Sequence, residues 1–449
     1  MPTDPPRPTL RGNLRAMPAP VWILAGGSFL NRFGSFVFPF LLLYVRHLGY
    51  SPSQAGLALS AYGLGALAAA GLGGWMADRL GRRASIVLSM VASAAAMLAL
   101  SQVRSLAAIV PLTFAAGCAA ESYRPASSAL LADVVAPARR VTAFAVYRLA
   151  VNAGFSIGPV VGGLLAERSF GFLFLGDAAT SLLYAIVAWR FLPEGRRPER
   201  RGEPSGAFRV ARRDRPFLLV CAATFLTASV YSQAFSTLAL RIRGLGLPPI
   251  AYGALISING GLIVLTELPL TSFTMRRPVR PVLAIGYVLT ALGFSATGLA
   301  TAFPALVATV FVWTVGEIVE SPVAAAFVAG LAPAHLRGRY QGIWTSMFAL
   351  AFIVGPAAGA ALFEASQPVL WIACAILPVV SGSLVLSIDR DRAEATRGAL
   401  EEGGDARAAP AAGFPDPPGS ALDPGEGDPL DERPLGQEEQ EDDGQHEEQ

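Results

Sequence analysis

The chain has 449 residues, of which 53% are hydrophobic and only 15% are charged, and its mean hydropathy is +0.47. A soluble protein of this length needs more polar surface, so the composition excludes an ordinary globular protein and predicts a polytopic membrane protein. The formal net charge of +2 combines an arginine-rich body with an acidic C-terminal segment, and the lack of any lysine excludes a Walker-type phosphate loop.

Twelve segments are long and apolar enough to cross a bilayer as helices, since a crossing needs about 20 predominantly apolar residues. None shows the alternating pattern of a strand, and a helix satisfies its own backbone in hydrocarbon. We therefore predict an all-α fold with 12 transmembrane helices. The predicted spans are residues 19–45, 52–77, 84–103, 106–132, 141–166, 169–191, 216–240, 249–273, 281–302, 304–331, 340–364 and 367–387.

Arginines cluster before the first span and in the loops that follow even-numbered spans, whereas the other loops carry few. Positively charged loops remain in the cytoplasm, so both termini are predicted to be cytoplasmic in a multi-pass protein of the cell membrane. The first apolar run is too long for a cleaved signal peptide and lacks a small-residue cleavage site, so we expect an uncleaved span.

Composition divides the chain into five parts. A polar segment with eight arginines separates six spans from the next six, and the last segment is acidic with few aromatics, as disordered segments are. The predicted parts are a cytoplasmic N-terminus 1–18, a six-helix bundle 19–192, a cytoplasmic arginine-rich linker 193–215, a second six-helix bundle 216–388 and a disordered acidic cytoplasmic tail 389–449.

An internal repeat supports two related bundles. Pro125 and Pro322 are 197 residues apart, and so are Pro159 and Pro356. Internal repeats of this kind are typical of secondary transporters, in which the binding site lies between the repeats.

The loop after span 2 combines a carboxylate, guanidiniums and glycines where the chain leaves the bilayer. Gly74 and Gly81 are expected to allow a tight turn, and Asp78 to accept hydrogen bonds from a helix N-terminus, where the dipole favours an anion. Asp133, at the end of span 4, is a candidate partner for Arg82. A simpler interpretation is that the arginines only hold the loop in the cytoplasm. The candidate residues are Gly74, Asp78, Arg79, Gly81, Arg82, Arg83 and Asp133.

Span 5 contains glycines at every fourth position, which would form one flat face that another helix can approach closely. A proline in the same span removes a backbone hydrogen bond and can bend the helix. Packing alone is one explanation of this pattern, and a role in transport is the other. The residues are Gly154, Gly158, Pro159, Gly162 and Gly163.

Polar and charged side chains inside spans are costly in hydrocarbon and should face a cavity or a partner. Arg32 lies about 11 residues into span 1, roughly 17 Å along a helix that rises 1.5 Å per residue. Glu121 and Arg124 are three residues apart and can pair on one helix face. The candidate proton- or substrate-binding residues are Asn31, Arg32, Glu121, Arg124, Arg148, Asn152, Asn259, Glu267, Glu317 and Glu320.

Glu317 and Glu320 share one face of span 10. Two carboxyl groups so close in a low dielectric should not both ionise readily, which is what a proton-coupling site requires. Alternatively, each acid pairs with an arginine across the bundle and only locks the fold. Aromatic side chains either line a substrate path or pack in the core: Phe33, Phe36, Phe40, Tyr44, Tyr123, Tyr231, Phe235 and Trp344.

These segments resemble signatures of the major facilitator superfamily. Residues 74–83 resemble its loop between helices 2 and 3, residues 154–163 resemble the fifth-helix motif of members that export compounds against protons, and residues 313–342 are similar to the tenth helix and loop of bacterial multidrug exporters. The resemblance covers about residues 19–388. It implies two pseudo-symmetric six-helix bundles, a latch at loop 74–83 that holds the outward-facing state, and a fifth helix that helps seal the path.

The chain departs from the resemblance in span 1, where several drug–proton antiporters carry an acid and this chain has Asn31 and Arg32. The leading hypothesis is a secondary transporter that exports small lipophilic or drug-like molecules against protons by alternating access. The alternatives are a facilitator or proton symporter for a small metabolite, and a non-transporting membrane sensor.

We expect no enzymatic activity and no cofactor, with the proton gradient as the energy source. The three histidines lie far apart in the sequence and predict no metal site. The expected partners are a small-molecule substrate, protons and the lipid bilayer, without nucleic acid, and the protein is expected to be a monomer.

Overall fold

The computed structural model describes residues 14–136, 139–195, 211–274, 277–332 and 336–388. The predicted N-terminal segment and linker are therefore described only in part. The predicted disordered tail, residues 389–449, lies outside the described residues.

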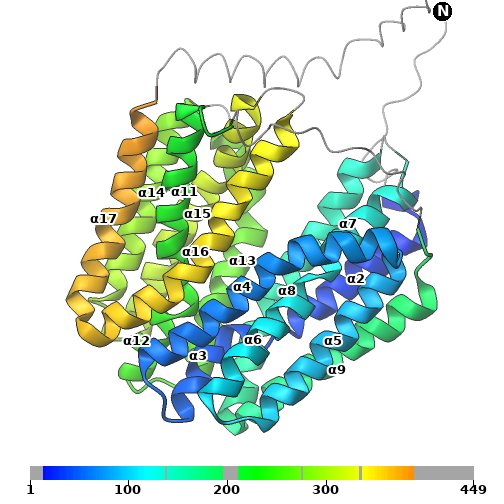
Figure 1. The fold of residues 1–449 in the computed structure, drawn as a ribbon. Helices are drawn as coiled ribbons and strands as arrows, with labels where there is room; N and C mark the ends of the chain where they lie inside the picture. The colour runs from blue at the N-terminus through cyan, green and yellow to red at the C-terminus, as the bar shows by residue number, and fades with distance from the viewer. Residues whose placement is uncertain (1–13, 137–138, 196–210, 275–276, 333–335, 389–449) are drawn as a thin grey trace, which may run out of the picture. The chain divides into compact units, whose positions relative to one another are not determined.

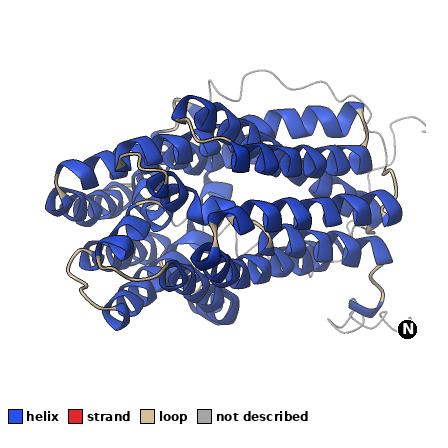
Figure 2. Cartoon of the chain, turned by 90° about the horizontal axis from the view of Figure 1, so that it is seen from below, coloured by secondary structure: helices blue, strands red, loops and turns tan. Residues whose placement is uncertain are grey.

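Helices and connecting loops make up the described part of the chain, which contains no strand (Figure 2). Within the described residues, twelve segments are long and apolar enough to cross a membrane, which confirms the predicted fold class. The helices are α2 (Ala19–Phe33), α3 (Val37–His47), α4 (Pro52–Arg79), α5 (Arg82–Gln102), α6 (Leu106–Glu121), α7 (Tyr123–Val134), α8 (Arg140–Arg168), α9 (Phe170–Phe191), α11 (Arg215–Tyr231), the short 3-10 helix η2 (Ser232–Phe235), α12 (Thr237–Gly244), α13 (Pro249–Thr274), α14 (Val279–Thr297), α15 (Phe303–Leu331), α16 (Arg337–Ala365) and α17 (Gln367–Leu386).

Helices α2 to α9 form one group and α11 to α17 form another, which we call the first and second halves (Figure 1). Because successive spans alternate in direction, the loops that join the spans fall at two levels. The arginine-rich end carries the loops near residues 80, 136, 194, 277 and 333, and the opposite end carries those near 49, 104, 169, 247, 300 and 366.

The apolar core is divided differently at the two ends. At the arginine-rich end each half has its own cluster, one around Tyr123 and one around Phe217. Towards the opposite end a single cluster contains residues of both halves, including Phe40, Tyr252 and Trp313. The two halves therefore share buried apolar surface at one end only.

Spans 1 and 7 are broken, which corrects the prediction of single continuous helices. In span 1 the helix stops at Phe33 and resumes at Val37, and in span 7 it gives way to η2 after Tyr231. A Cβ on Gly34 would lie 1.8 Å from the Thr180 hydroxyl, so only glycine allows α9 to approach the chain there. In span 7, Gln233 donates through its side-chain amide to the carbonyl of Gly355, 3.0 Å away. Span 4 is also interrupted, between α6 and α7.

Helices α4 and α16 join the halves at the opposite end. α4 begins with a capping box between Ser51 and Gln54, with Pro52 as its first residue, a combination that satisfies otherwise unpaired backbone donors. The next residue, Ser53, donates its backbone N–H to Glu364 Oε2 across the two halves at 3.0 Å. The start of α4 therefore also contributes to the contact that joins the two halves at this end.

The α4–α16 contact continues towards the middle of the two helices. Ala357 donates its backbone N–H to Ser60 Oγ at 3.2 Å, and a Cβ on Gly63 would lie 2.8 Å from the carbonyl of Phe352. Beyond this point, towards the arginine-rich end, the two helices line opposite walls of a cavity.

Candidate functional site

A cavity of about 710 Å³ lies between the two halves, on the arginine-rich side of the α4–α16 contact, and it is open rather than enclosed. Its first-half wall carries three charged side chains, whereas its second-half wall carries only neutral ones. The lining residues are Arg32, Phe38, Tyr62, Gly63, Ala66, Leu67, Ala70, Glu121, Arg124, Val151, Asn152, Phe155, Gly342, Thr345, Ser346, Phe348, Ala349 and Phe352.

Arg32, Glu121 and Arg124 form an ion-pair cluster on the first-half wall. Arg32 Nη2 donates to both oxygens of Glu121, at 2.9 and 3.0 Å, and Arg124 Nη1 donates to Glu121 Oε2 at 3.0 Å. The predicted pairing of Glu121 with Arg124 is present, and Arg32 is an additional partner that sequence spacing does not reveal. Side-chain exposure is 15% for Arg32 and 58% for Arg124, so the outer arginine is the accessible one.

Asp177 on α9 is a buried acid that the sequence analysis missed. It is 5% exposed, and its Oδ2 accepts the backbone N–H of Val37 at 3.3 Å. Val37 is the first residue of α3, so Asp177 satisfies a donor that the break in span 1 leaves without a helical partner. An isolated acid in the apolar run of span 6 was the available signal.

Glu317 and Glu320 line a second, smaller cavity of about 80 Å³ within the second half. Phe348 and Phe352 line both cavities, so the acids lie behind a pair of aromatic rings from the main cavity. The remaining lining residues are Thr224, Thr227, Ala228, Tyr231, Thr290, Ser321 and Ala324.

Asn259 on α13 positions Glu317. Its Nδ2 donates to Glu317 Oε2 at 3.0 Å and to Thr314 Oγ1 at 3.1 Å. Glu320 packs with its Cβ against Gly286 of α14, where a Cβ on the glycine would lie 2.6 Å away. Within the described residues neither Glu317 nor Glu320 is within salt-bridge distance of an arginine.

Glu267 differs from these two acids because it has an arginine partner. Arg148 Nη2 on α8 donates to Glu267 Oε1 on α13 at 2.9 Å, so this pair links the halves. Asn152, one turn from Arg148, lines the main cavity. Asn31 does not line it, because the side chain is buried and donates to Met90 Sδ at 3.4 Å.

The arginines after span 2 attach that loop to its own half. Arg82 is buried and donates from Nε to Asp133 Oδ2 at 2.8 Å, the pairing that the sequence predicts. Arg83 forms an ion pair with Glu194. Arg79 lies over the ring of Trp75, with 5.4 Å between the guanidinium carbon and the ring centroid.

The predicted turn at Gly74 was wrong. Gly74 lies inside α4, and no atom lies within 4 Å of the position of a Cβ there. Gly81, with a φ of 93°, makes the turn by itself, in a region that favours glycine. Asp78 is exposed, and among the described residues it has no hydrogen bond or ion pair, so the predicted bonds from a helix N-terminus are absent in this conformation.

The glycines of span 5 allow close helix contacts, as their spacing predicts. A Cβ on Gly154 would lie 2.5 Å from the carbonyl of Phe29, and one on Gly158 would lie 2.5 Å from that of Phe33, both on α2. Gly162 approaches the ring of Phe40. Gly163 packs against α13 of the other half, at 2.6 Å from the Cα of Ile250.

Pro159 also contributes to the contact between α8 and α13. A Cβ on Gly253 would lie 2.1 Å from the Pro159 carbonyl, and the backbone N–H of Val160 donates to Ser257 Oγ at 3.2 Å. Span 5 is thus packed between α2 of its own half and α13 of the other.

Most of the aromatic residues selected from the sequence pack in the core. Phe36, Phe40, Tyr44, Tyr123, Phe235 and Trp344 are buried. Of the eight, Tyr231 lines the acidic cavity. The main cavity is lined instead by Phe38, Tyr62, Phe155, Phe348 and Phe352.

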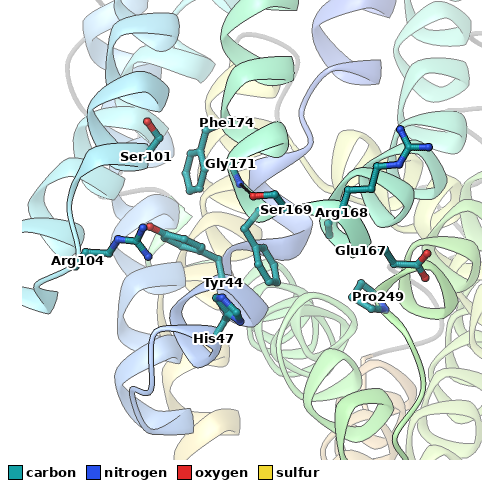
Figure 3. Close-up of a pocket in the computed structure, with 12 residues that line it drawn as sticks. Tyr44, His47, Ser101, Arg104, Glu167, Arg168, Ser169, Gly171, Phe174 and Pro249 are labelled. Carbon is teal, nitrogen blue, oxygen red and sulfur yellow. Dashed lines mark hydrogen bonds between the residues drawn. The ribbon is translucent and has the colours of Figure 1, made fainter.

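A further cavity of about 520 Å³ lies at the opposite end, lined by first-half residues and by Pro249 of α13 (Figure 3). The side chains of Tyr44 and Arg104 point towards each other, whereas Arg168 and Glu167 point away from the centre. Its charged residues are exposed at the surface, so it provides no enclosed site.

Comparison with known proteins shows which family this chain matches. A model of the Major Facilitator Superfamily matches residues 24–277 and 237–418. The uncharacterized MFS-type transporter YttB of Bacillus subtilis (strain 168) is 28% identical over 356 residues, which cover 78% of this chain and 89% of that protein. The multidrug resistance protein MdtH of Enterobacter sp. (strain 638) is 25% identical over 342 residues, 74% of this chain and 83% of that one.

Among solved structures, the peptide transporter POT in complex with sulfate superposes with a TM-score of 0.73. The superposition covers 87% of this chain and 100% of that one, at 16% sequence identity. At this identity the likeness concerns the fold alone.

Proposed function

Because the chain belongs to the Major Facilitator Superfamily, and is therefore a multi-pass secondary transporter, we propose that it exports small lipophilic or drug-like molecules in exchange for protons. The substrate occupies the cavity between the halves, and transport proceeds by alternating access to the two sides of the membrane. No cofactor takes part, and the proton gradient supplies the energy.

The proposal rests on one observation: some of the acids inside the spans have an arginine partner and others do not. Glu121 and Glu267 have arginine partners, whereas Glu317 and Glu320 have none among the described residues. A carboxyl group in an apolar cavity without a counter-ion is neutralised either by a proton or by a cationic substrate. Competition between the two for one carboxyl pair links release of one to binding of the other, which is antiport.

The proposed direction of transport follows from the orientation of the protein in the membrane. We place the arginine-rich end in the cytoplasm of a cell-membrane protein, in agreement with the distribution of arginines. The main cavity then opens to the cytoplasm, and the α4–α16 contact closes the outer side. This is a state that collects substrate from inside the cell. The name of the relative MdtH, a multidrug resistance protein, agrees with efflux.

The test is proton movement in proteoliposomes that contain an internal pH dye. Lipophilic cations, zwitterionic drugs and sugars are added one at a time, with and without an imposed pH gradient. We expect a substrate-triggered proton flux that Glu317→Gln or Glu320→Gln lowers by at least about tenfold, because each removes one carboxyl of the coupling pair. Glu167→Gln, an exposed acid at the opposite end, is the matched control and should leave the flux unchanged.

Substrate movement without proton flux would contradict antiport and favour a facilitator. Proton flux with the same sign as substrate flux would favour a symporter. A proton flux unchanged in both glutamine variants would move the coupling site away from α15.

A further inference from the structure

The main cavity and the smaller acidic cavity share Phe348 and Phe352, and the charges that line them are of opposite sign in the two halves. The first-half wall contributes two guanidiniums and one carboxylate, Arg32, Arg124 and Glu121, and so has a formal charge of +1. The second half contributes two carboxyl groups, Glu317 and Glu320, behind Phe348 and Phe352.

Arg124 is the cation that is free to bind a ligand. Arg32 is held by both oxygens of Glu121, with a side-chain exposure of only 15%. Arg124 uses Nη1 for the single bond to Glu121 Oε2, and its side chain is 58% exposed in the cavity. A guanidinium has five N–H donors, so Arg124 keeps donors with which to bind a carboxylate.

The middle of the path is apolar and aromatic. Phe348 and Phe352 line both cavities, and Phe38 and Phe155 line the main one. A ligand that reaches from the first-half wall to the acids must therefore place an apolar or aromatic portion against these rings.

We propose that the preferred substrates are aromatic zwitterions, with a carboxylate that binds Arg124 and a protonated amine that binds the Glu317–Glu320 pair. This inference rests on the proposed export function and narrows its substrate class. A simple cation is repelled by the first-half wall, and a simple anion is repelled by the acids. A zwitterion loses hydration from both of its charged groups on binding, but each of them meets a group of opposite charge, so discrimination comes from repulsion of the wrong partners as well as from attraction.

The experiment is equilibrium binding of three compounds of one scaffold to the purified full-length protein in lipid nanodiscs. The compounds are para-piperazinylbenzoic acid, which is a zwitterion, its methyl ester, which is only a cation, and its N-acetyl derivative, which is only an anion. We expect the zwitterion to bind at least about tenfold more tightly than either, a difference of about 1.4 kcal/mol.

Substitutions in each half test which wall produces the preference for the zwitterion over the ester and which produces the preference over the N-acetyl compound. Arg124→Gln should abolish the preference for the zwitterion over the ester, and Arg124→Lys should restore part of it. The double variant Glu317→Gln with Glu320→Gln should abolish the preference over the N-acetyl compound. Arg104→Gln, an exposed arginine in the pocket at the opposite end, is the matched control and should change neither ratio.

Equal or tighter binding of the ester to the wild-type protein would overturn the inference, as would an Arg124→Gln variant that weakens all three compounds equally. Absence of binding by all three compounds would overturn it too. Because binding is measured without a proton gradient, these outcomes are distinct from failure of antiport. Zwitterion preference without proton flux would leave the substrate class standing and remove the coupling.

Discussion

At the scale of single residues, the partner of each buried charge decides what that charge can do. Glu121 forms ion pairs with two arginines, so it stabilises the first half. Glu317 receives a hydrogen bond from the neutral amide of Asn259, in a cavity of about 80 Å³ that Phe348 and Phe352 also line. The sequence indicates the pairing of Glu121 with Arg124, three residues away, but only the structure shows that Arg32 also pairs with Glu121 and that Glu317 has no arginine partner among the described residues.

Replacement of Glu121 by glutamine should lower stability, because Arg32 would stay buried without its carboxylate. Loss of a charged partner at a largely buried position costs about 2–3 kcal/mol. The melting temperature of the purified protein in detergent measures the effect. Glu320→Gln is the matched control and should leave the melting temperature nearly unchanged, since it breaks no ion pair among the described residues. Equal melting temperatures for Glu121→Gln and the wild type would contradict the structural role.

At the scale of helices, glycine spacing reports close contacts only where another helix is present. In span 5 the glycine series faces α2 and α13, and the predicted contacts exist. In span 2 the motif glycine Gly74 faces open space, whereas its neighbour Gly73 lies against the carbonyl of Ser122, at the start of α7. A one-residue difference is about 100° around a helix, so the motif alone does not identify the contact face.

The neighbouring glycines of α4 give a matched pair of variants. Gly73→Ala would place a Cβ 2.3 Å from the Ser122 carbonyl, so we expect a loss of about 1–3 kcal/mol of stability from overpacking. Gly74→Ala meets no atom within 4 Å and should be neutral or stabilising by up to about 1 kcal/mol, because alanine favours the helix. Thermal unfolding of both variants tests this, and an equal effect of the two would rule out the close contact between Gly73 and Ser122.

At the scale of the whole molecule, the arrangement of the three apolar clusters determines how the two halves can move relative to each other. One cluster is shared by both halves, and each half has one of its own. The halves are joined at the opposite end and along α8 and α13, and each keeps an independent core at the arginine-rich end. Conversion to a state open at the opposite end requires the α4–α16 contact to separate while these independent cores remain intact.

The pair formed by Arg148 and Glu267 crosses the halves and should bias this equilibrium. Arg148→Glu places two carboxylates opposite each other, so the halves should separate more often at this point. The additional change Glu267→Arg restores opposite charges and should restore the wild-type distribution. Distances between spin labels on the two halves, measured by pulsed electron resonance, report the populations. Identical distributions in all three proteins would show that the pair has no influence.

Asp78 should matter for the transport cycle and not for folding. It is exposed and unpaired within the described structure, so Asp78→Asn should insert at normal abundance with an unchanged melting temperature. If loop 74–83 acts as the latch that its sequence resembles, the variant should transport substrate more slowly because the outward-facing state loses a contact. Normal flux at normal abundance would refute the latch.

The sequence by itself determined the number of spans, the helical class and the repeat, because hydrocarbon length and backbone satisfaction are properties of the chain. It offered Asp133 as a candidate partner for Arg82, and the structure contains that pair. Only the tertiary structure decided that Arg32 belongs to Glu121, that Asp177 supports the break in span 1 and that Glu317 and Glu320 lack arginine partners among the described residues. Such pairings join residues tens to hundreds of positions apart, and whether a buried charge is balanced depends on which helices pack together. That packing is a property of the assembled halves and is absent from any single apolar run.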